Sequence, residues 1–286
     1  AWLCNLRGSD LPNTPVFLAY LLIREESADL FIDPRKLGPA TVASLRKDGV
    51  RCHPYETVNE ALRELPPETV FFVDPAQMNA HLYQSVANGI KIVTGTNPVT
   101  VLKSRKNPEE LALIQESMVD EGLALVSLFA WIEEEMSRGA SLPEWDVSEK
   151  LLELRKKSPR FIETSFTTIA AVGANASQPH YAPYPEKSSP ITAGTLLLLD
   201  SGGQYLTGTT DITRTIGIGP VPEAMKKDYT AVLRAHIALA GARFPTGLHA
   251  GRLASLVRSP LWQVGADYGH GTGHGVRFVL NVHEAH

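Results

Sequence analysis

The stretch Leu196-Leu-Leu-Leu-Asp-Ser-Gly-Gly-Gln-Tyr205, with Gly208-Thr-Thr-Asp-Ile-Thr-Arg-Thr215 close behind it, decides how the chain is interpreted. An apolar run that ends on Asp200 and continues into Ser-Gly-Gly predicts a buried strand, a glycine-rich turn and a returning strand. Such an antiparallel pair brings Asp200 beside Asp211. Two ionised carboxylates at the end of a buried strand repel each other, and a bound cation between them removes that repulsion.

Each aspartate taken alone has a simpler explanation. Asp200 would cap a turn through Ser201 and Gly202, and Asp211 would form an ion pair with Arg214. The metal interpretation gains weight only when the two aspartates are considered together with the histidines that come later in the chain.

Those histidines lie in Tyr268-Gly-His-Gly-Thr-Gly-His-Gly-Val276, which is followed by Asn281-Val-His-Glu284. Glycines interleave His270 and His274, a pattern too loose for a core helix or a central strand. We expect the glycines to let the backbone turn tightly and present the imidazoles into a cavity. Imidazole is the commonest protein metal ligand and a usual proton-transfer group near neutral pH. The alternative is an exposed glycine loop with incidental histidines.

Two further histidine positions need separate treatment. His180 lies in the turn-rich segment 173–183, which we expect to be a loop at a sheet edge, where binding groups often lie. A lone loop histidine is otherwise usually a surface residue. The terminal His283-Glu-Ala-His286 is not the zincin motif, because its histidines are three residues apart rather than four.

Composition excludes several classes of protein. The 286 residues carry 27 basic and 31 acidic side chains, a formal net charge of −4 that gives no reason to expect a nucleic-acid partner. No run approaches the ~20 apolar residues of a membrane span. The two cysteines, Cys4 and Cys52, are interpreted as small buried hydrophobic residues. The chain begins without an initiator methionine or a signal-peptide pattern, so we expect its true amino terminus to be absent.

The chain is predicted to form two domains. Residues 1–104 alternate short apolar runs with amphipathic segments, which is typical of a small α/β domain. Strands are expected at 16–23, 29–32, 69–73 and 90–93, and helices at 39–47, 57–65 and 76–86. We place the boundary in the proline-containing basic segment 96–106.

Residues 105–286 open with a strong helix start, since Asn107 can cap, Pro108 suits the first helical position and Glu110 completes a capping box. This helix is predicted to run to about residue 138 as core scaffolding. Helices at 145–157, 222–244 and 250–257 and strands at 166–172, 195–200 and 209–218 do not alternate strictly, which favours an α+β domain.

Together these motifs resemble the Xaa-Pro aminopeptidases of the pita-bread, or creatinase-like, metallopeptidase fold (family M24). The resemblance rests on segments 199–205, 208–215, 180–183, 270–276 and 280–284, and in the first domain on 1–10 and 15–17. It is greatest to the long, three-domain cytosolic type. It implies an α+β pita-bread catalytic domain, preceded by a smaller, partial α/β domain like the creatinase N-terminal domain.

The resemblance also implies residue roles. Asp200, Asp211 and His274 would be metal ligands, with Asp211 bridging two divalent ions; manganese is favoured, and zinc or cobalt would also fit. His180, His270 and His283 would be catalytic histidines that contact the substrate and stabilise the tetrahedral intermediate. The last two ligands of the family are glutamates further along the chain, so we expect the second domain to be incomplete at its C-terminal end.

The implied activity is removal of the N-terminal residue from peptides with proline in second position, by attack of a metal-activated hydroxide. The implied protein is a cytoplasmic homodimer with no nucleic-acid or membrane partner. A prolidase, which cuts only dipeptides, is disfavoured by the motifs around Trp2 and His270. A methionine aminopeptidase is disfavoured by the α/β domain in front. A non-catalytic pita-bread module that binds peptides or histones would usually lack the three metal ligands.

Overall fold

A computed structural model describes residues 1–284 of the chain; Ala285 and His286 lie outside the described residues. The structure divides into two compact units, Ala1–Arg105 and Lys106–His286. Each unit has its own buried clusters of apolar side chains, and each is described by itself. Among residues 1–284, no helix is both long and apolar enough to cross a membrane.

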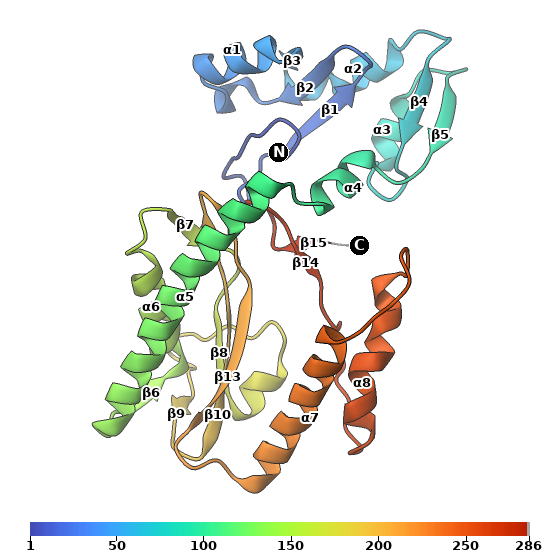
Figure 1. Cartoon of the computed structure of the whole chain (residues 1–286). Helices are drawn as coiled ribbons and strands as arrows, with labels where there is room; N and C mark the ends of the chain where they lie inside the picture. Colours follow the sequence, from blue (N-terminus) through green and yellow to red (C-terminus); the bar gives the residue numbers. More distant parts are fainter. Residues whose placement is uncertain (285–286) are drawn as a thin grey trace. The chain divides into compact units, whose positions relative to one another are not determined.

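The first unit combines two small sheets with short helices (Figure 1). In the larger sheet the order is β1-β2-β3, with β1 antiparallel and β3 parallel to β2; β4 and β5 form a separate parallel pair. This confirms the predicted small α/β domain. The strands are β1 (Ala19–Ile23), β2 (Ala28–Ile32), β3 (Val50–His53), β4 (Val70–Val73) and β5 (Lys91–Thr94); the helices are α1 (Pro39–Lys47), α2 (Val58–Arg63), α3 (Ala80–Ser85) and α4 (Pro98–Ser104).

Strand β3 was not predicted, because four residues of mixed polarity carry too little pattern. A long-range charge cluster holds it in place. The buried carboxylate of Asp29 on β2 accepts hydrogen bonds from Arg51 Nε at 2.7 Å and His53 Nε2 at 2.8 Å, and from Arg24, which follows β1. Burial alone would raise the pKa of Asp29, but these hydrogen bonds hold it at about 2. One carboxylate therefore ties the three strands together.

The two cysteines are half-buried and pack against the small apolar cluster of Leu30, Ile32 and Leu45. This agrees with their interpretation as small hydrophobic residues. Burial raises the pKa of both thiols, so neither is activated as a nucleophile.

The second unit opens with α5 (Pro108–Ser137), which begins where its capping box predicts. The Asn107 side chain accepts a hydrogen bond from the backbone N–H of Glu110 at 2.8 Å, and the Glu110 carboxylate accepts one from the Asn107 N–H at 3.0 Å. The other elements are α6 (Glu144–Arg155), α7 (Glu223–Ala240), α8 (Ala254–Trp262), β6 (Leu142–Pro143), β7 (Phe161–Thr164), β8 (Ile169–Val172), β9 (Pro190–Ile191), β10 (Thr195–Ser201), β11 (Gly203–Tyr205), β12 (Gly208–Thr209), β13 (Ile212–Ile218), β14 (Gly275–Val276) and β15 (His283–Glu284).

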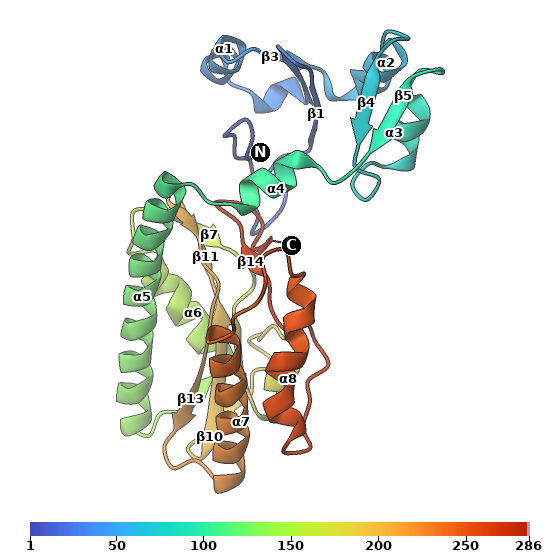
Figure 2. The ribbon, with the colours of Figure 1, turned by 45° about the vertical axis from the view of Figure 1, so that its right-hand side comes forward.

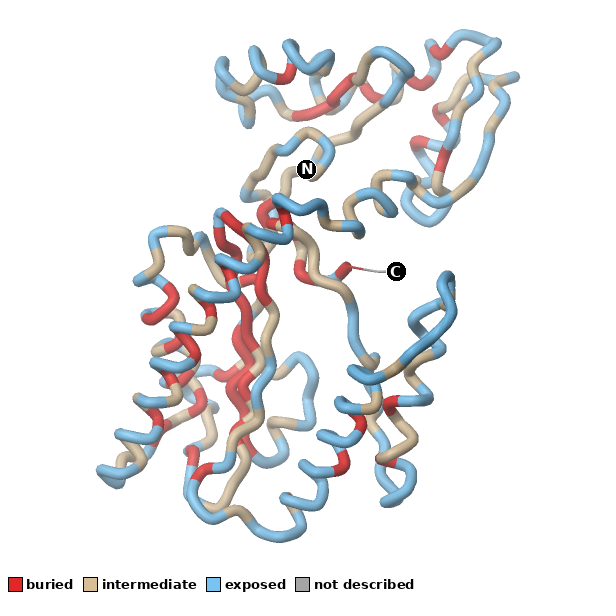
Figure 3. Tube along the Cα trace, viewed as in Figure 1, coloured by how far each residue is buried: buried red, intermediate tan, exposed pale blue. Residues whose placement is uncertain are grey.

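The central sheet of this unit has the order β13-β10-β8 and is antiparallel throughout. Because side chains alternate along a strand, β10 presents different residues to its two faces. Leu197 and Leu199 belong to the core formed with α5 and α6, and the residues that alternate with them, including Asp200, face the other way. Figure 3 shows this concentration of buried residues along the sheet. Helices α7 and α8 lie on the side opposite α5 and α6 (Figures 1 and 2).

The single returning strand predicted at 209–218 is wrong in detail. The chain leaves β10 at Gly202, forms the hairpin β11–β12 against β7, and only then enters β13, so that Asp211 lies between two strands. The backbones cross closely here, since a Cβ on Gly202 would lie 1.9 Å from the carbonyl oxygen of Thr210. Only glycine fits this crossing, and it brings the chain back beside Asp200.

Candidate metal centre

The contact between Asp211 and His274 is the centre of the candidate site. Nε2 of His274 lies 3.3 Å from Oδ2 of Asp211, and the two side chains are 32% and 19% exposed. Asp211 comes from the crossing between β12 and β13, and His274 from the irregular segment that leads into β14. Two residues far apart in the sequence therefore meet side by side, as expected for ligands of a shared cation.

The hydrogen bond on the other ring nitrogen of His274 identifies its tautomer. Nδ1 lies 2.7 Å from the carbonyl oxygen of Gly275, and because a carbonyl only accepts, Nδ1 carries the proton and donates. In the neutral imidazole, Nε2 then carries a lone pair directed at the Asp211 carboxylate. A histidine held in this way by a backbone carbonyl is typical of metal ligation. Lone pair and carboxylate repel unless a cation or a proton lies between them.

The charge of Asp200, on β10, affects the pKa of Asp211. Burial raises the pKa of Asp211, the nearby Asp200 charge raises it further, and His274 lowers it. Oδ1 of Asp200 accepts a hydrogen bond of 2.7 Å from the Thr213 hydroxyl directly across the strand pair. The alternative ion pair between Asp211 and Arg214 is not among the described contacts, because Arg214 donates to the Thr213 carbonyl instead.

Two more of the predicted histidines are linked to this cluster. The ring of His283 stands nearly perpendicular to that of His274, with centroids 4.3 Å apart. The pKa of His283 is lowered, first by burial and then by the charges of His274, His180 and Arg277. His180, in the loop after β8, is linked to this cluster only through that electrostatic effect on the pKa of His283. Both rings are accessible, because both residues are exposed.

His270 is held apart from this group. Its ring packs against that of Tyr268, with centroids 4.8 Å apart and the planes tilted by 32°, and the Arg258 guanidinium lies 3.9 Å from the centroid of the Tyr268 ring. Nδ1 of His270 donates to the Gly271 carbonyl at 2.8 Å. Among the described contacts, none joins His270 to Asp200, Asp211 or His274. The glycines Gly269, Gly271 and Gly273 have ordinary φ angles and room for a Cβ, so this segment shows no steric need for them.

A buried ion pair supports the two aspartates from the other face of the sheet, and it was not predicted. Arg155 on α6 donates from Nε to Glu121 on α5 at 3.0 Å and from Nη2 to the Ser201 hydroxyl at 2.9 Å. The Thr210 hydroxyl donates to the same Glu121 carboxylate at 3.0 Å. Ser201 and Thr210 are the chain neighbours of Asp200 and Asp211. The pair therefore fixes the backbone on which both carboxylates stand.

One signal in the sequence could have identified Glu121. It lies four residues before Leu125 and seven before Leu128, directly on the apolar stripe of α5, where an unpaired charge is costly.

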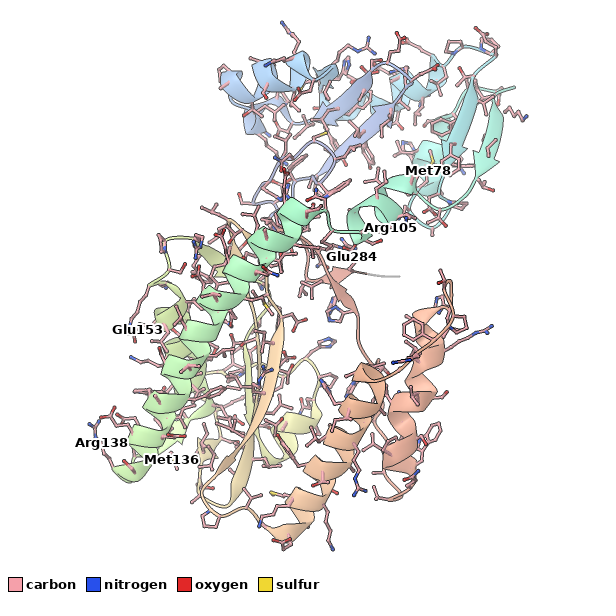
Figure 4. All side chains as sticks on the ribbon, viewed as in Figure 1. Met78, Arg105, Met136, Arg138, Glu153 and Glu284 are labelled. Carbon is pink, nitrogen blue, oxygen red and sulfur yellow. The ribbon has the colours of Figure 1, made fainter. Side chains whose placement is uncertain are left out.

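The ring hydroxyl of Tyr205 also donates to Glu121, at 2.9 Å, and the pKa of Tyr205 is raised, mainly by burial and then by the Glu121 charge. The far end of the second unit, by contrast, carries ordinary surface charges such as Arg138 (Figure 4).

The donor set suits a metal ion in its chemistry. Within residues 1–284, no three histidine, cysteine, aspartate or glutamate side chains already converge at metal-binding distances. Asp200, Asp211 and His274 nevertheless fit a divalent cation, because two carboxylates and one unprotonated imidazole nitrogen are ligands of manganese, zinc and cobalt. The repulsive contact between Asp211 and His274 is the one that such a cation would relieve.

Known proteins resemble this chain over its whole length. The model of metallopeptidase family M24 matches residues 113–286, and the model of the creatinase/prolidase N-terminal domain matches residues 1–110. Aminopeptidase P2 of Arabidopsis thaliana is 37% identical over 313 residues, which cover 99% of this chain and 44% of that protein. A probable Xaa-Pro aminopeptidase P of Pyricularia oryzae is 39% identical over 297 residues, covering 99% and 48%.

Among solved structures, the X-prolyl aminopeptidase of Caenorhabditis elegans superposes with a TM-score of 0.92 at 35% identity, covering 99% of this chain and 47% of that one. That protein is described as a cytosolic enzyme with a di-nuclear active site. The chain thus spans about half the length of the relatives it matches.

Proposed function

The chain belongs to metallopeptidase family M24, and from that membership we propose that the protein carrying it is an Xaa-Pro aminopeptidase. Its fold is the one that the motifs implied, a pita-bread domain preceded by a creatinase N-terminal domain. The observation that carries the proposal is the 3.3 Å contact between Asp211 and His274 beside Asp200, in a chain similar throughout its length to Xaa-Pro aminopeptidases. The substrates are peptides with proline in second position.

The proposed metal centre holds two divalent ions, by analogy with the di-nuclear site of the Caenorhabditis elegans enzyme. Asp200, Asp211 and His274 would be the residues of this chain that hold them. The bound ions would supply a hydroxide near neutral pH, because they lower the pKa of a coordinated water. Manganese is our preferred identity, with zinc or cobalt as alternatives that suit the same donors.

The chain's own residues then have separable tasks. The Gly275 carbonyl keeps the Nδ1 proton of His274 and so leaves Nε2 available to a metal. His180 is exposed on the loop after β8 and acts electrostatically on His283, and its imidazole would donate to an oxyanion that develops on the substrate carbonyl. His283, whose pKa is lowered, stays neutral at pH 7 and can accept or donate a hydrogen bond to the peptide. His270, whose ring packs against Tyr268, would be a further histidine that contacts the substrate, as the family resemblance implies.

We also propose that the protein is a cytosolic homodimer. The location rests on the description of the Caenorhabditis elegans enzyme, and the dimer on the family resemblance alone. The net charge of −4 gives no electrostatic reason to expect a nucleic-acid partner.

The test uses the intact protein that carries this chain, stripped with a chelator and reloaded with manganese, zinc or cobalt. We expect release of arginine from Arg-Pro-Pro only after metal is restored, and no release from Arg-Ala-Pro. Cleavage of the dipeptide Arg-Pro without cleavage of Arg-Pro-Pro would identify a prolidase instead. Metal binding without cleavage of any of these peptides would contradict the proposed activity.

The role of His180 is tested with His180→Ala in the same protein. Loss of one oxyanion donor should lower kcat by ~100- to 1,000-fold while metal content and KM stay nearly unchanged. Loss of metal from this variant, or full turnover, would show that the assigned role is wrong.

A further inference from the structure

The carboxylate of Glu144 is completely buried and collects several hydrogen bonds from a single loop. Glu144 is the first residue of α6 and has no exposed surface. Its Oε1 accepts from the Val172 N–H at 2.7 Å, and its Oε2 accepts from the Tyr181 hydroxyl at 2.7 Å and the Ser189 N–H at 3.0 Å. The Asn175 amide nitrogen lies 3.1 and 3.0 Å from the two oxygens.

All of these donors belong to one excursion of the chain, the segment 173–189 between β8 and β9, or to the residue that immediately precedes it. Val172 is the last residue of β8, and Ser189 immediately precedes β9, so the carboxylate closes the loop at both of its ends. Tyr181 contacts the same carboxylate from the middle of the loop. It is the neighbour of His180, which is itself exposed.

A simpler role for Glu144 would be to place a negative charge at the amino-terminal end of α6. That role does not require burial, since such charges act favourably while exposed. Taking a carboxylate fully out of water is costly unless donors replace the lost solvation. Here the loop supplies those donors, and charge-assisted hydrogen bonds of this kind are the strong ones. The burial of Glu144 is therefore explained by the loop and not by the helix.

We propose that Glu144 and Tyr181 are positioning residues that set the location of His180 in the active site. The inference rests on the proposed function of His180, and it assigns Glu144 and Tyr181 no contact with the substrate. Tyr181 is half-buried and directed to Glu144, and this anchor lies next to the peptide unit of His180. The many turn-forming residues of the loop do not by themselves fix its backbone conformation, and the hydrogen bonds to the buried Glu144 carboxylate do.

The first test does not depend on activity. Tyr181→Phe removes one hydroxyl and keeps the ring, whereas substitution of Glu144 risks the fold. We expect amide hydrogen exchange within residues 173–189 to become about five- to tenfold faster, and exchange elsewhere to stay unchanged. Tyr184→Phe is the matched control, because Tyr184 lies in the same loop, is 57% exposed, and its described hydrogen bonds are accepted by its backbone carbonyl. Unchanged exchange in Tyr181→Phe would overturn the proposal.

The second test links Tyr181 to His180 through a double-mutant cycle in the metal-loaded protein. Tyr181→Phe should lower kcat on Arg-Pro-Pro about tenfold with unchanged KM and metal content, and should have no further effect in a His180→Ala background. A merely structural loss would instead lower the activity of both backgrounds equally, and that result would overturn the proposal. If the wild-type protein cleaves no Xaa-Pro peptide, the proposed function fails, and the exchange experiment still decides whether the loop is held by Glu144.

Discussion

Nε2 of His274 faces Oδ2 of Asp211 across 3.3 Å with its lone pair, because the ring proton is held on Nδ1 by the Gly275 carbonyl. This geometry leaves Nε2 of His274 available to a metal, whereas the ring of His270 packs against Tyr268. The histidines of one glycine-rich segment therefore should not respond alike to substitution.

We predict that His274→Ala lowers metal affinity by more than about 100-fold, since loss of the outer partners of metal ligands alone costs 10- to 100-fold. His270→Ala is the control and should bind metal normally. Calorimetric titration of the chelator-treated protein with manganese and zinc measures both. Equal affinities in wild type and His274→Ala would exclude His274 as a ligand.

The buried pair of Glu121 and Arg155 should be costly to break from one side. Arg155→Met leaves a carboxylate without its cation in the core, and we expect the free energy of unfolding to fall by about 3–5 kcal/mol. Glu121→Leu combined with Arg155→Met should cost less than either single change, because no buried charge remains. Urea unfolding measures the three variants.

The control for that series is Arg138→Met, at the solvent-exposed end of α5, where the ion pair with Glu134 is more than half exposed on both sides. It should change stability by no more than about 0.5 kcal/mol. If Arg155→Met were equally mild, the pair would not be supporting the aspartates as described.

Gly202 and Gly122 offer a matched pair of glycine-to-alanine changes. In Gly202→Ala the added methyl group, at its ideal position, would lie 1.9 Å from the carbonyl oxygen of Thr210. The substitution should therefore destabilise the protein by about 3 kcal/mol or more. Gly122 lies within α5, and a Cβ added there would have no atom within 4 Å, so Gly122→Ala should stabilise by about 0.5–1 kcal/mol. Thermal unfolding distinguishes the two, and a tolerated Gly202→Ala would contradict the close crossing.

The charge cluster of the first unit predicts a pH dependence. The folded-state pKa of Asp29, about 2, lies below its ordinary value of 3.8, so the folded protein gains stability above pH 3.8 and loses it as the pH falls toward 2. The difference corresponds to about 2 kcal/mol. Asp29→Asn should therefore cost about that amount at pH 7 and almost nothing at pH 2.

The comparison for Asp29 is Asp48→Asn, an exposed residue at the end of α1 whose side chain has no hydrogen-bond partner among the described residues. Unfolding curves of both variants between pH 7 and pH 2 provide the measurement. A constant difference between Asp29→Asn and wild type over this range would show that the titration is not coupled to folding.

Local signals in the sequence predicted the elements that depend on local chemistry. Helix α1 has the predicted bounds, and α5 starts at its capping box, because caps and apolar periodicity act within a few residues. Strand β3 and the β11–β12 hairpin were missed, since the first depends on Asp29 from another strand and the second on a backbone crossing at Gly202. Such long-range contacts produce no periodic pattern in the sequence.

The candidate site divides in the same way. The motifs named Asp200, Asp211 and four histidines. The structure brings Asp200, Asp211, His274 and His283 together, whereas His270 lies apart and His180 is linked to the group only by its effect on the pKa of His283; the individual roles stay predictions. Glu121, Arg155 and Glu144 resemble ordinary helix charges in the sequence. Only their burial and partners reveal them as supports of the site.

Asp200 and Ser201 point to opposite faces of β10, and this limits insertions and deletions in the strand. Ser201 is bound to Arg155 on the buried face and Asp200 points to the other, so inserting or deleting one residue in the strand would exchange them. A carboxylate would then lie beside Glu121, and a hydroxyl would replace a proposed metal ligand. We expect β10 to tolerate no change of length, whereas the exposed turn at Leu206, between β11 and β12, can lengthen without moving either aspartate.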